Sequence, residues 1–414
     1  MEYKRTILKH VIDTTKSFPI TLITGARQVG KTTLVKHLEK DLGYNYITFD
    51  KTELKNEARK NPYEFIRKYK TPLIIDEIQH VKELFAEIVS IVNQVKAEKG
   101  AKAALGMYIL TGSQKFQLMQ HVSESMAGRV GIIEMPTLSQ VEIRGWDSSV
   151  TTVNNDYLIR RSLDREITND EIYKSIIRGF YPGRWEFPDD EIKKFFDSYI
   201  KTYLEQDVRD IKNVQDLGKF KDLIYKLAYS TGRDFIPEDI ANEIGIKSDT
   251  VRSWVNVLVT SDIFTLVQPY YESSVKKRLV KGKKIYFNDT GLVCHIMGIK
   301  KIETLLNSPF KGSIIETYIF NEIKKSYINN GIEPRFFYYR DSNQNEIDLL
   351  FFNEDGKWDL IECKSGSNYG INHIKEFKQM ESSAYGINGG CIICFCKEPK
   401  KINANTFEFP IRCI

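Results

Sequence analysis

The chain has 414 residues, 42% hydrophobic and 28% charged, which excludes a disordered or fibrous protein and predicts roughly two or three globular domains. Its 60 Lys and Arg against 55 Asp and Glu leave a net charge of +5, which permits nucleic-acid binding without predicting it. It has no apolar stretch long enough to cross a bilayer, no signal-peptide core and only six cysteines, so we expect a soluble, cytoplasmic protein with no membrane partner.

The first third of the chain alternates short apolar runs with polar segments whose apolar residues recur at helical spacing. The segments 31–40, 53–70 and 83–99 are expected to be helices. Strands are expected at the runs 19–24, 44–49, 72–75, 106–110 and 130–134. Strand–helix alternation of this kind predicts an α/β fold built on a parallel sheet with helices on both faces.

A glycine-rich loop separates the first expected strand from the first helix. Its residues from Gly25 to Thr32 fit the phosphate-binding pattern G-x-x-x-x-G-K-[ST], in the strand–loop–helix context that gives the pattern its meaning. Glycines let backbone N–H groups surround a phosphate, Lys31 would reach the β- and γ-phosphates, and Thr32 would ligate Mg²⁺. The sequence therefore predicts binding of ATP or ADP with Mg²⁺, by Gly25, Ala26, Arg27, Gln28, Val29, Gly30, Lys31, Thr32 and Thr33.

Two further strand ends carry polar side chains that fit the same site. The apolar run ending at Ile75 is followed by Asp76 and Glu77, and acids at the end of a buried strand need a function that offsets their desolvation. Asp76 would hold Mg²⁺, mostly through water, and Glu77 would orient and deprotonate the attacking water. Ser113 follows the next strand, where a sensor of the γ-phosphate would lie. Together with Lys31, these groups predict an ATPase.

These motifs resemble those of the AAA-superfamily ATPases, and more closely the bacterial and archaeal branch with a C-terminal domain of unknown function. The resemblance implies that residues 1–150 form the ATPase core, that Ser113 is the sensor and that Arg129 is a candidate transition-state arginine. It covers essentially the whole chain, and its motifs lie at 25–32, 73–77, 110–113, 127–130 and 134–142.

Arg129 leaves two questions open. It could stabilise charge that develops on the γ-phosphate, or it could form a surface or interdomain salt bridge. If it acts on nucleotide, it acts either in its own subunit or in a neighbouring one, and the second alternative requires a homo-oligomer. Arg27, inside the loop, is expected to pair with a structural acid rather than with nucleotide.

The middle of the chain reads as a helical connector or lid at 151–213, followed by a different module at 214–300. In this module, helices are expected at 217–229, from Pro237 to a stop at Gly245, and from a cap at Ser248. Two strands follow, at 263–271 and 284–287. Three helices and a β-hairpin predict a winged helix-turn-helix.

The hairpin of this module is strongly basic. Residues 275–284 hold six Lys or Arg and no acid, so the hairpin could grip phosphates while the third helix faces a groove of DNA. Such a module can instead serve as a lid or docking surface, and a charge run is often only a solvated hairpin. The following stretch 286–292 fits the family pattern without suggesting a physical role. The predicted DNA contacts are Arg252, Asn256, Lys276, Lys277, Arg278, Lys281, Lys283 and Lys284.

The remainder, 301–414, is expected to be a third α/β unit. A helix is predicted at 312–328, and then a further helix lies between the last two of four strands. The strands are predicted at 335–340, 346–352, 358–363 and 390–396.

One strand pair of this unit carries a carboxylate–lysine pattern. Glu362 and Lys364 share a strand face, hairpin pairing brings Asp348 beside them, and Glu316 on the preceding helix can complete the group. Such a set can bind a divalent cation and position water near a phosphodiester. The D-x13-E-x-K pattern resembles the restriction-endonuclease-like nuclease fold, which implies that these four residues form a nuclease site. The alternative is an amphipathic hairpin with a salt-bridged Glu–Lys pair.

The cysteines at 391, 394 and 396 invite a zinc interpretation. Cys394 and Cys396 face one way along an apolar run and Cys391 faces the other, and no second CxxC or histidine cluster accompanies them. We therefore expect buried strand cysteines.

Three functions remain in competition. The first is an ATP-hydrolysing switch that couples nucleotide state to the winged-helix and nuclease-like modules and acts on DNA. The second is an ATP-gated, metal-dependent DNA nuclease. The third is a non-catalytic, nucleotide-gated regulator that binds DNA or protein.

Overall fold

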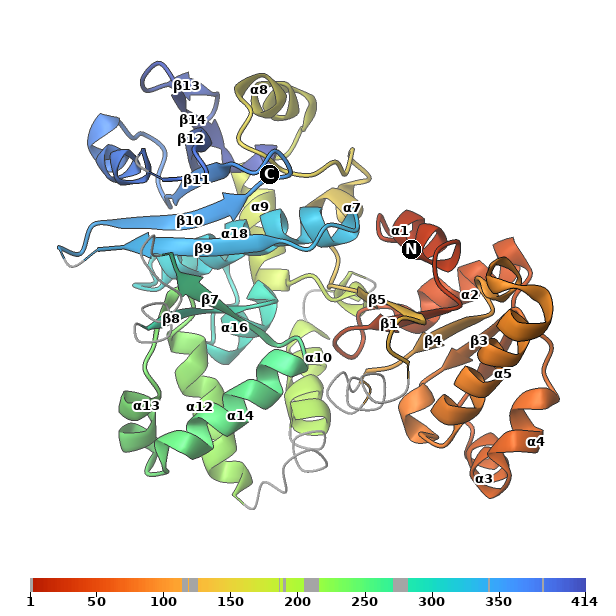
Figure 1. Cartoon of the computed structure of the whole chain (residues 1–414). Helices are drawn as coiled ribbons and strands as arrows, with labels where there is room; N and C mark the ends of the chain where they lie inside the picture. Colours follow the sequence, from red (N-terminus) through yellow and green to blue (C-terminus); the bar gives the residue numbers. More distant parts are fainter. Residues whose placement is uncertain are drawn as a thin grey trace. The chain divides into compact units, whose positions relative to one another are not determined.

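The computed structural model describes residues 3–113, 118, 126–185, 187–188, 191–204, 216–270, 282–341, 343–381 and 383–414. The chain divides into two compact units (Figure 1). The first comprises Met1–Leu138 with the short segments Thr260–Asp262 and Ile328–Gly331. The second comprises Ser139–Val259, Ile263–Tyr327 and Ile332–Ile414.

The first unit is built on a five-stranded sheet in the order β2-β3-β4-β1-β5, and all its pairings are parallel. The predicted α/β class and parallel sheet are therefore confirmed. The central strands are buried along their whole length, as in sheets covered on both faces. The strands are β1 (Ile20–Thr24), β2 (Asn45–Thr48), β3 (Leu73–Asp76), β4 (Tyr108–Thr111) and β5 (Val130–Glu134).

The helices of this unit follow the predicted segments with two differences, and the first is α1 (Leu8–Thr15), which lies at a segment where no helix was predicted. The expected helix at 53–70 is two helices, because Asn61 accepts a hydrogen bond from the Glu64 N–H and Pro62 starts a new helix. The helices are α1 (Leu8–Thr15), α2 (Lys31–Leu42), α3 (Thr52–Lys60), α4 (Pro62–Arg67) and α5 (Leu84–Lys99).

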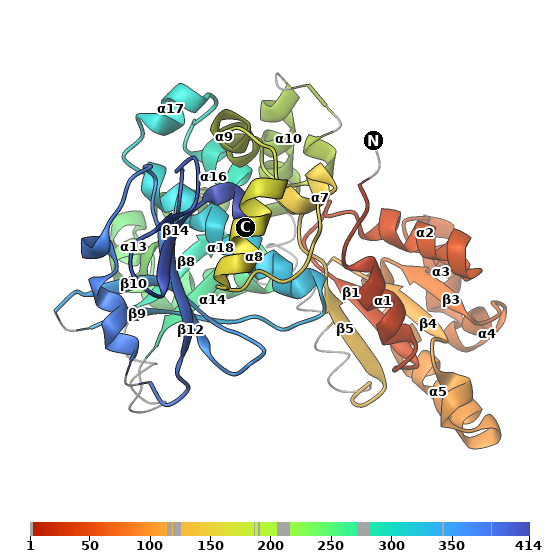
Figure 2. The same cartoon turned by 90° about the horizontal axis from the view of Figure 1, so that it is seen from above.

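Both faces of the parallel sheet are covered. Ile20, Leu73 and Leu110 belong to the same buried cluster as Phe85 of α5. Alternate strand residues such as Ile23 are buried outside that cluster. On this second face α1 contacts β1 and β5, and α2 contacts β2 and β3 (Figure 2). Helices therefore pack on both sides of the sheet, whose strand ends carry the polar groups.

The second unit contains a nine-stranded sheet in the order β13-β14-β12-β11-β10-β9-β7-β8-β6. β9, β10 and β11 are antiparallel, whereas β11, β12 and β14 are parallel. The strands are β6 (Arg233–Phe235), β7 (Phe264–Pro269), β8 (Lys283–Phe287), β9 (Arg335–Arg340), β10 (Glu346–Phe352), β11 (Trp358–Cys363), β12 (Ile387–Cys394), β13 (Lys400–Lys401) and β14 (Thr406–Pro410).

The helices of the second unit include those expected in the connector and in the three-helix module. The helix expected between β11 and β12 is instead two short 3₁₀ helices, Ile371–His373 and Lys375–Met380. The α-helices are α7 (Gln140–Arg144), α8 (Asn155–Asp164), α9 (Asn169–Arg178), α10 (Ile192–Tyr199), α12 (Leu217–Tyr229), α13 (Pro237–Ile244), α14 (Ser248–Thr260), α16 (Thr290–Ile296), α17 (Ile302–Leu306) and α18 (Lys311–Asn329).

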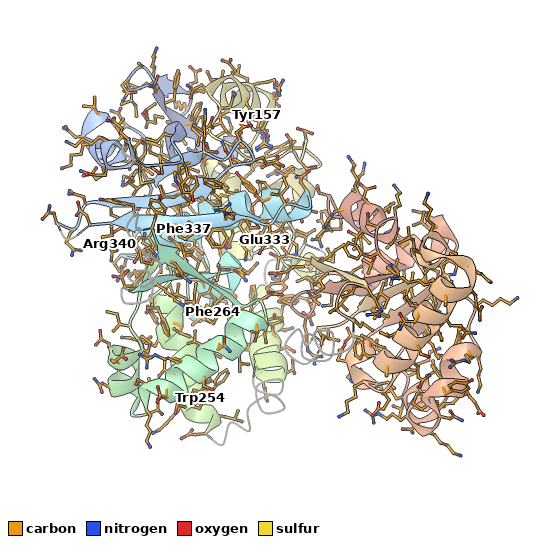
Figure 3. All side chains as sticks on the ribbon, in the orientation of Figure 1. Tyr157, Trp254, Phe264, Glu333, Phe337 and Arg340 are labelled. Carbon is orange, nitrogen blue, oxygen red and sulfur yellow. The ribbon has the colours of Figure 1, made fainter. Side chains whose placement is uncertain are left out.

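The three-helix module and the C-terminal strands share one sheet. β8 pairs antiparallel with β7 and β6, and β7 pairs in parallel with β9 through Gln268 and Phe337. Figure 3 marks Trp254 on α14, Phe264 on β7, and Phe337 and Arg340 on β9. The β8–β7–β9 pairing makes these strands neighbours in one sheet. Side chains of β8 can therefore contact those of the C-terminal strands. Among the described residues, no helix is both long and apolar enough to span a membrane.

Candidate functional sites

The glycine-rich loop connects β1 to α2 as the sequence predicts. Gly25 has a φ of 144°, and a Cβ there would lie 2.3 Å from the carbonyl oxygen of Met135. Gly30 has a φ of 96° and directly precedes α2, so Lys31 is the first residue of the helix. Both glycines thus meet a local steric requirement that lets the loop turn tightly towards the helix N-terminus.

The Lys31 side chain is folded into the loop. The residue is 5% exposed, and its Nζ donates to the carbonyl oxygens of Gly25 at 2.9 Å and Ala26 at 2.8 Å. Burial lowers the pKa of Lys31 to about 8, although Glu77 acts in the opposite direction. Neutral carbonyls compensate only part of the hydration that a buried ammonium loses. A bound anion would therefore form a favourable electrostatic interaction with Lys31.

Asp76 ends β3 and is fully buried. Its Oδ2 accepts hydrogen bonds from the hydroxyls of Thr32 and Tyr46, each at 2.9 Å, and its Oδ1 accepts from Thr111. The carboxylate thus gathers hydroxyls from α2, β2 and β4 at one edge of the sheet. Burial and the negative Asp76 also raise the pKa of the Tyr46 phenol. Sequence reasoning missed Tyr46, which lies at a strand position with no motif of its own.

Glu77 lies next to Asp76 in a conformation that few residues adopt. Its φ is 58°, and its backbone N–H donates to Thr111 Oγ1 at 3.1 Å. Its carboxylate accepts from Ser113 Oγ at 3.3 Å and from the Gln79 amide. Gln28 of the loop also has a positive φ, of 62°, so two strained non-glycine residues face this site. The structure therefore brings the predicted Glu77 and Ser113 together.

Arg5 supports the loop from outside the motif. Its guanidinium donates to the carbonyl oxygens of Val29 and Pro136, each at 2.7 Å. This residue joins the phosphate-binding loop to the segment after β5 and was also missed in the sequence, where no pattern connects position 5 to position 29.

Arg129 does not join this site within the same chain. It precedes β5, and its carbonyl oxygen accepts from the Ile20 N–H at the opposite edge of the sheet. Thr24 at the loop edge pairs with Glu134, about 15 Å further along the strand. The Arg129 side chain instead donates to Asn93 Oδ1 at 2.9 Å. The own-subunit alternative for Arg129 is inconsistent with this arrangement.

The four residues of the C-terminal pattern lie together: Glu316 is on α18, Asp348 on β10 and Glu362 on β11, and Lys364 directly follows β11. The hairpin pairs Leu349 with Ile361, and the Asp348 Oδ2 accepts from the Cys363 N–H at 2.8 Å. Lys364 forms an ion pair with Glu362. Burial and the nearby Asp348 carboxylate together raise the pKa of Glu362 to about 9, although Lys364 acts in the opposite direction. Burial likewise raises the pKa of Glu316 to about 7.

Lys284 corrects one prediction of the sequence. It was expected among the exposed DNA contacts, but its side chain is 2% exposed and lies in the carboxylate cluster. Its Nζ is 2.9 Å from Glu316 Oε1, 2.5 Å from Glu346 Oε1 and 3.9 Å from Asp348 Oδ1. Burial opposes the charge of Lys284, but these carboxylates outweigh it and raise the pKa of Lys284 well above its ordinary value. The cause is the β8–β7–β9 pairing, which places the end of the basic segment inside the second unit.

Tyr286 gives a physical role to the start of the unexplained 286–292 stretch. Its hydroxyl donates to Glu316 Oε1 at 2.5 Å, and it lies two residues from Lys284 on the same strand. Further along, Asp289 caps α16 by accepting from the Leu292 N–H at 3.0 Å and also accepts from Phe180 N–H at 2.6 Å. Sequence reasoning missed Tyr286 because its partners lie on elements distant in the chain.

Of the other predicted DNA contacts, three lie in the described part of the chain and four do not. Arg252 and Asn256 are exposed on α14, and Arg252 forms ion pairs with Glu238 and Asp249. Lys283 is half-buried at the start of β8. Outside the described residues lie Lys276, Lys277, Arg278 and Lys281.

The strand cysteines are buried, as predicted. Cys394 and Cys396 lie with Glu408 of β14 so that one ligand atom from each is within 4.8 Å of the others, and among the described residues this is the one such trio. The Cys394 thiol donates to Glu408 Oε1 at 3.1 Å, which accounts for part of this proximity. By the same measure the oxygens of Glu316, Asp348 and Glu362 are more widely spaced.

Three family models match successive parts of the chain. Residues 17–144 match a model described as "AAA domain", so the first unit contains an AAA-type P-loop domain, in agreement with its parallel sheet and loop. Residues 169–303 and 311–414 match two models described as domains of unknown function, DUF8612 and DUF4143. The carboxylate cluster therefore draws residues from two matched regions, because Lys284 lies in 169–303 and Glu316 lies in 311–414.

Similar proteins are known in bacteria and archaea. An uncharacterized protein of Mycobacterium tuberculosis is 25% identical over 333 residues, which cover 80% of this chain and 67% of that protein. An uncharacterized protein of Methanocaldococcus jannaschii is 22% identical over 349 residues, with 76% and 71% covered. The structure of a Walker-type ATPase of Pyrococcus abyssi has a TM-score of 0.45 and 14% identity, and the match covers 70% of this chain and 94% of that one.

Proposed function

We propose that the first unit hydrolyses ATP in a Mg²⁺-dependent reaction. The observation that carries the proposal is the contact between Thr32 Oγ1 and Asp76 Oδ2, at 2.9 Å. It joins the end of the phosphate-binding loop to the acid of the neighbouring strand end. A hydroxyl and a carboxylate at this edge are the oxygen donors that fit Mg²⁺ in P-loop enzymes, where the ion neutralises phosphate charge.

Each remaining group has a role in that reaction. Lys31 opens α2 and would exchange its two carbonyl contacts for phosphate oxygens. Glu77 would orient the attacking water and accept its proton. Ser113, which donates to Glu77, would contact the γ-phosphate. Helix α2 and the loop N–H groups add positive potential for the triphosphate.

The test measures ATP turnover by the full chain with and without Mg²⁺. Lys31→Ala should lower turnover by about a hundredfold or more, because a charged phosphate contact is lost. Glu77→Gln should keep ATP binding while turnover falls. Lys36→Ala, an exposed lysine on the same helix, is the matched control and should retain activity. Normal hydrolysis by Lys31→Ala would overturn the assignment.

A second candidate function is phosphodiester cleavage by the second unit. It is favoured because Glu316, Asp348, Glu362 and Lys364 lie in one cluster, as a nuclease site of this type needs. Asp348 and Glu362 offer carboxylate oxygens that fit a divalent cation, which would polarise the phosphate. Lys364 would polarise the attacking water or stabilise transition-state charge. The water would attack phosphorus, and the bond from phosphorus to the leaving oxygen would break.

We further propose that the module from α12 to β8 is of winged-helix type and brings DNA to this cluster. Support comes from its three helices, its antiparallel strands and the basic composition of 275–284. Exposed Arg252 and Asn256 would contact DNA from α14. ATP turnover in the first unit would act as a switch on this second unit.

A supercoiled-plasmid assay with ATP and either Mg²⁺ or Mn²⁺ tests the nuclease role. Wild type should nick DNA, whereas Asp348→Ala and Lys364→Ala should not. Asp355→Ala and Lys357→Ala are matched controls on the exposed turn of the same hairpin and should nick normally. Salt-sensitive DNA binding without cleavage under any metal would favour the non-catalytic regulator instead.

A further inference from the structure

Two lysines contact the carboxylate oxygens of the cluster, each on a different side. On one side, Glu316 Oε1 receives both the Lys284 ammonium and the Tyr286 hydroxyl. On the other side, Glu362 Oε1 receives Lys364. Asp348 lies between them, with Oδ1 3.9 Å from Lys284 Nζ and Oδ2 bound to the Cys363 N–H. The cluster thus contains a second lysine that the D-x13-E-x-K pattern does not include.

Lys284 is more enclosed than Lys364. Their side chains are 2% and 27% exposed, respectively. Arg340 Nη2 lies 2.7 Å from Glu346 Oε2, while Glu346 Oε1 contacts Lys284. Lys284 is therefore enclosed by the cluster, whereas about a quarter of the Lys364 side chain is exposed.

We propose that the Lys284 ammonium takes the cation position beside Glu316 and competes there with a divalent metal ion. This inference rests on the metal site proposed above. With Lys284 in place, a divalent ion would be held by Asp348 and Glu362. Glu316 would form its ion pair with Lys284 and would not bind the metal. Lys284 thus determines which carboxylates of the motif are available as ligands.

The physical reason is charge compensation inside a poorly solvated site. Glu316 and Asp348 each need a nearby positive charge when buried, and Lys284 supplies it from β8. A divalent ion that approached Glu316 would meet the repulsion of this ammonium at short range. Without the ammonium, the same carboxylates would form a more negative site that a divalent ion could fill.

Mn²⁺ binding to the full, nucleotide-free chain tests the proposal without nucleic acid or turnover. Binding is measured by calorimetry, and the signal of a protein with both Asp348→Asn and Glu362→Gln is subtracted to remove ions bound elsewhere. Lys284→Met should bind Mn²⁺ about tenfold more tightly than wild type, or bind a second ion. Glu316→Gln should weaken binding at least about tenfold more in Lys284→Met than in wild type, as a double-mutant cycle reports.

Three further variants make the test specific. Lys283→Met is the matched control, because this lysine precedes Lys284 and its side chain points to the other face of β8. It should bind Mn²⁺ like wild type, as should Lys284→Arg, which keeps the charge. Lys284→Gln removes the charge but keeps a hydrogen-bond donor, so it repeats the test if the methionine variant does not fold.

Equal Mn²⁺ affinity in wild type, Lys284→Met and Lys284→Gln would overturn this inference but not the proposed metal site. Loss of binding in Lys284→Met, with the protein folded by circular dichroism, would overturn it as well. Absence of Asp348- and Glu362-dependent Mn²⁺ binding in every variant would overturn the proposed metal site and the inference with it.

Discussion

Lys31 and Lys284 are both buried lysines, but their surroundings differ in charge. Lys31 donates to two neutral carbonyl oxygens, and burial lowers its pKa to about 8. Lys284 lies among carboxylates, and these raise its pKa despite burial. The comparison indicates that the phosphate-binding loop holds a cation ready for an anionic ligand, whereas the carboxylate cluster already contains its counter-ion.

The difference follows from where each lysine lies in the fold. Lys31 starts a helix at the carboxyl edge of a parallel sheet, where backbone dipoles favour an anion. Lys284 enters from β8 into a junction of strands whose acids come from α18 and β10. A ligand should therefore change the two regions differently, and the predictions below test that difference by stability and by activity.

The largest stability effect is expected at Lys284. In metal-free buffer, Lys284→Met should lower the free energy of unfolding by about 3 kcal/mol, because Glu316 and Glu346 lose a buried counter-charge. Urea unfolding of the nucleotide-free chain measures the change. Lys283→Met should change it by less than about 0.5 kcal/mol. An unchanged stability of Lys284→Met would show that the ammonium is not needed to balance the cluster.

A pH series should distinguish the two lysines. The native state releases the Lys31 proton near pH 8, whereas the unfolded chain keeps it to about 10.5. Between these values the unfolded state binds more protons, so the contribution of Lys31 to the unfolding free energy rises with pH. Relative to Lys31→Met, wild type should gain about 2.5 kcal/mol across this window.

The same series should show no rise from the titration of Lys284 itself. Its native pKa is raised, so its contribution is fully present below pH 10.5 and is lost only above the native pKa. Lys284 itself therefore titrates in neither state from pH 7 to 9. The gap between wild type and Lys284→Met should still widen modestly over this range, because Lys284 lowers the pKa of Glu316 and without the ammonium this buried carboxyl keeps its proton to higher pH. A gap between wild type and Lys31→Met that stayed constant over the full window would remove the proposed contrast.

At neutral pH, Lys31→Met should have little effect on stability. Removal of a buried cation is favourable, and loss of its bonds to Gly25 and Ala26 is unfavourable, so the two effects largely cancel. We expect an unchanged unfolding free energy or a gain of up to about 1 kcal/mol. A loss of about 2 kcal/mol would indicate that the loop depends on the lysine for folding as well as for nucleotide.

The sequence predicted the first unit better than the second for a physical reason. In the first unit each motif lies at the end of its own strand, and parallel strands bring those ends to one edge without further information. Asp76, Glu77 and Ser113 could therefore be assembled from order alone. Tyr46 and Arg5 could not, because they reach the site from positions that carry no pattern.

In the second unit most of the predicted strands and helices are present, but the sequence did not predict which strands pair with one another. The short parallel pairing of β7 with β9 joins two segments that composition separates. That pairing makes Lys284 a buried residue of the carboxylate cluster instead of an exposed basic one. Long-range strand pairing depends on tertiary packing, so the hairpin pattern of 284–287 could not reveal its partner.

The smallest predicted effect concerns how Glu77 is held in the ATP site. Gln79 donates to both Glu77 and Ser113, and its buried Oε1 has no hydrogen-bond partner among the described residues. The amide therefore orients the Glu77 carboxylate and connects it to Ser113. Gln79→Ala should lower kcat for ATP by about three- to tenfold and leave KM nearly unchanged, because it affects the carboxylate that positions water and leaves the phosphate contacts of Lys31 intact.

Arg129→Ala provides the comparison for that measurement. In its own chain Arg129 lies at the far edge of the sheet, so turnover at protein concentrations where the chain is monomeric should be unchanged. An effect of Arg129→Ala that grows with protein concentration would instead place this arginine at the nucleotide of a neighbouring copy. If Gln79→Ala raised KM rather than lowering kcat, the amide would act in nucleotide binding and not in the orientation of Glu77.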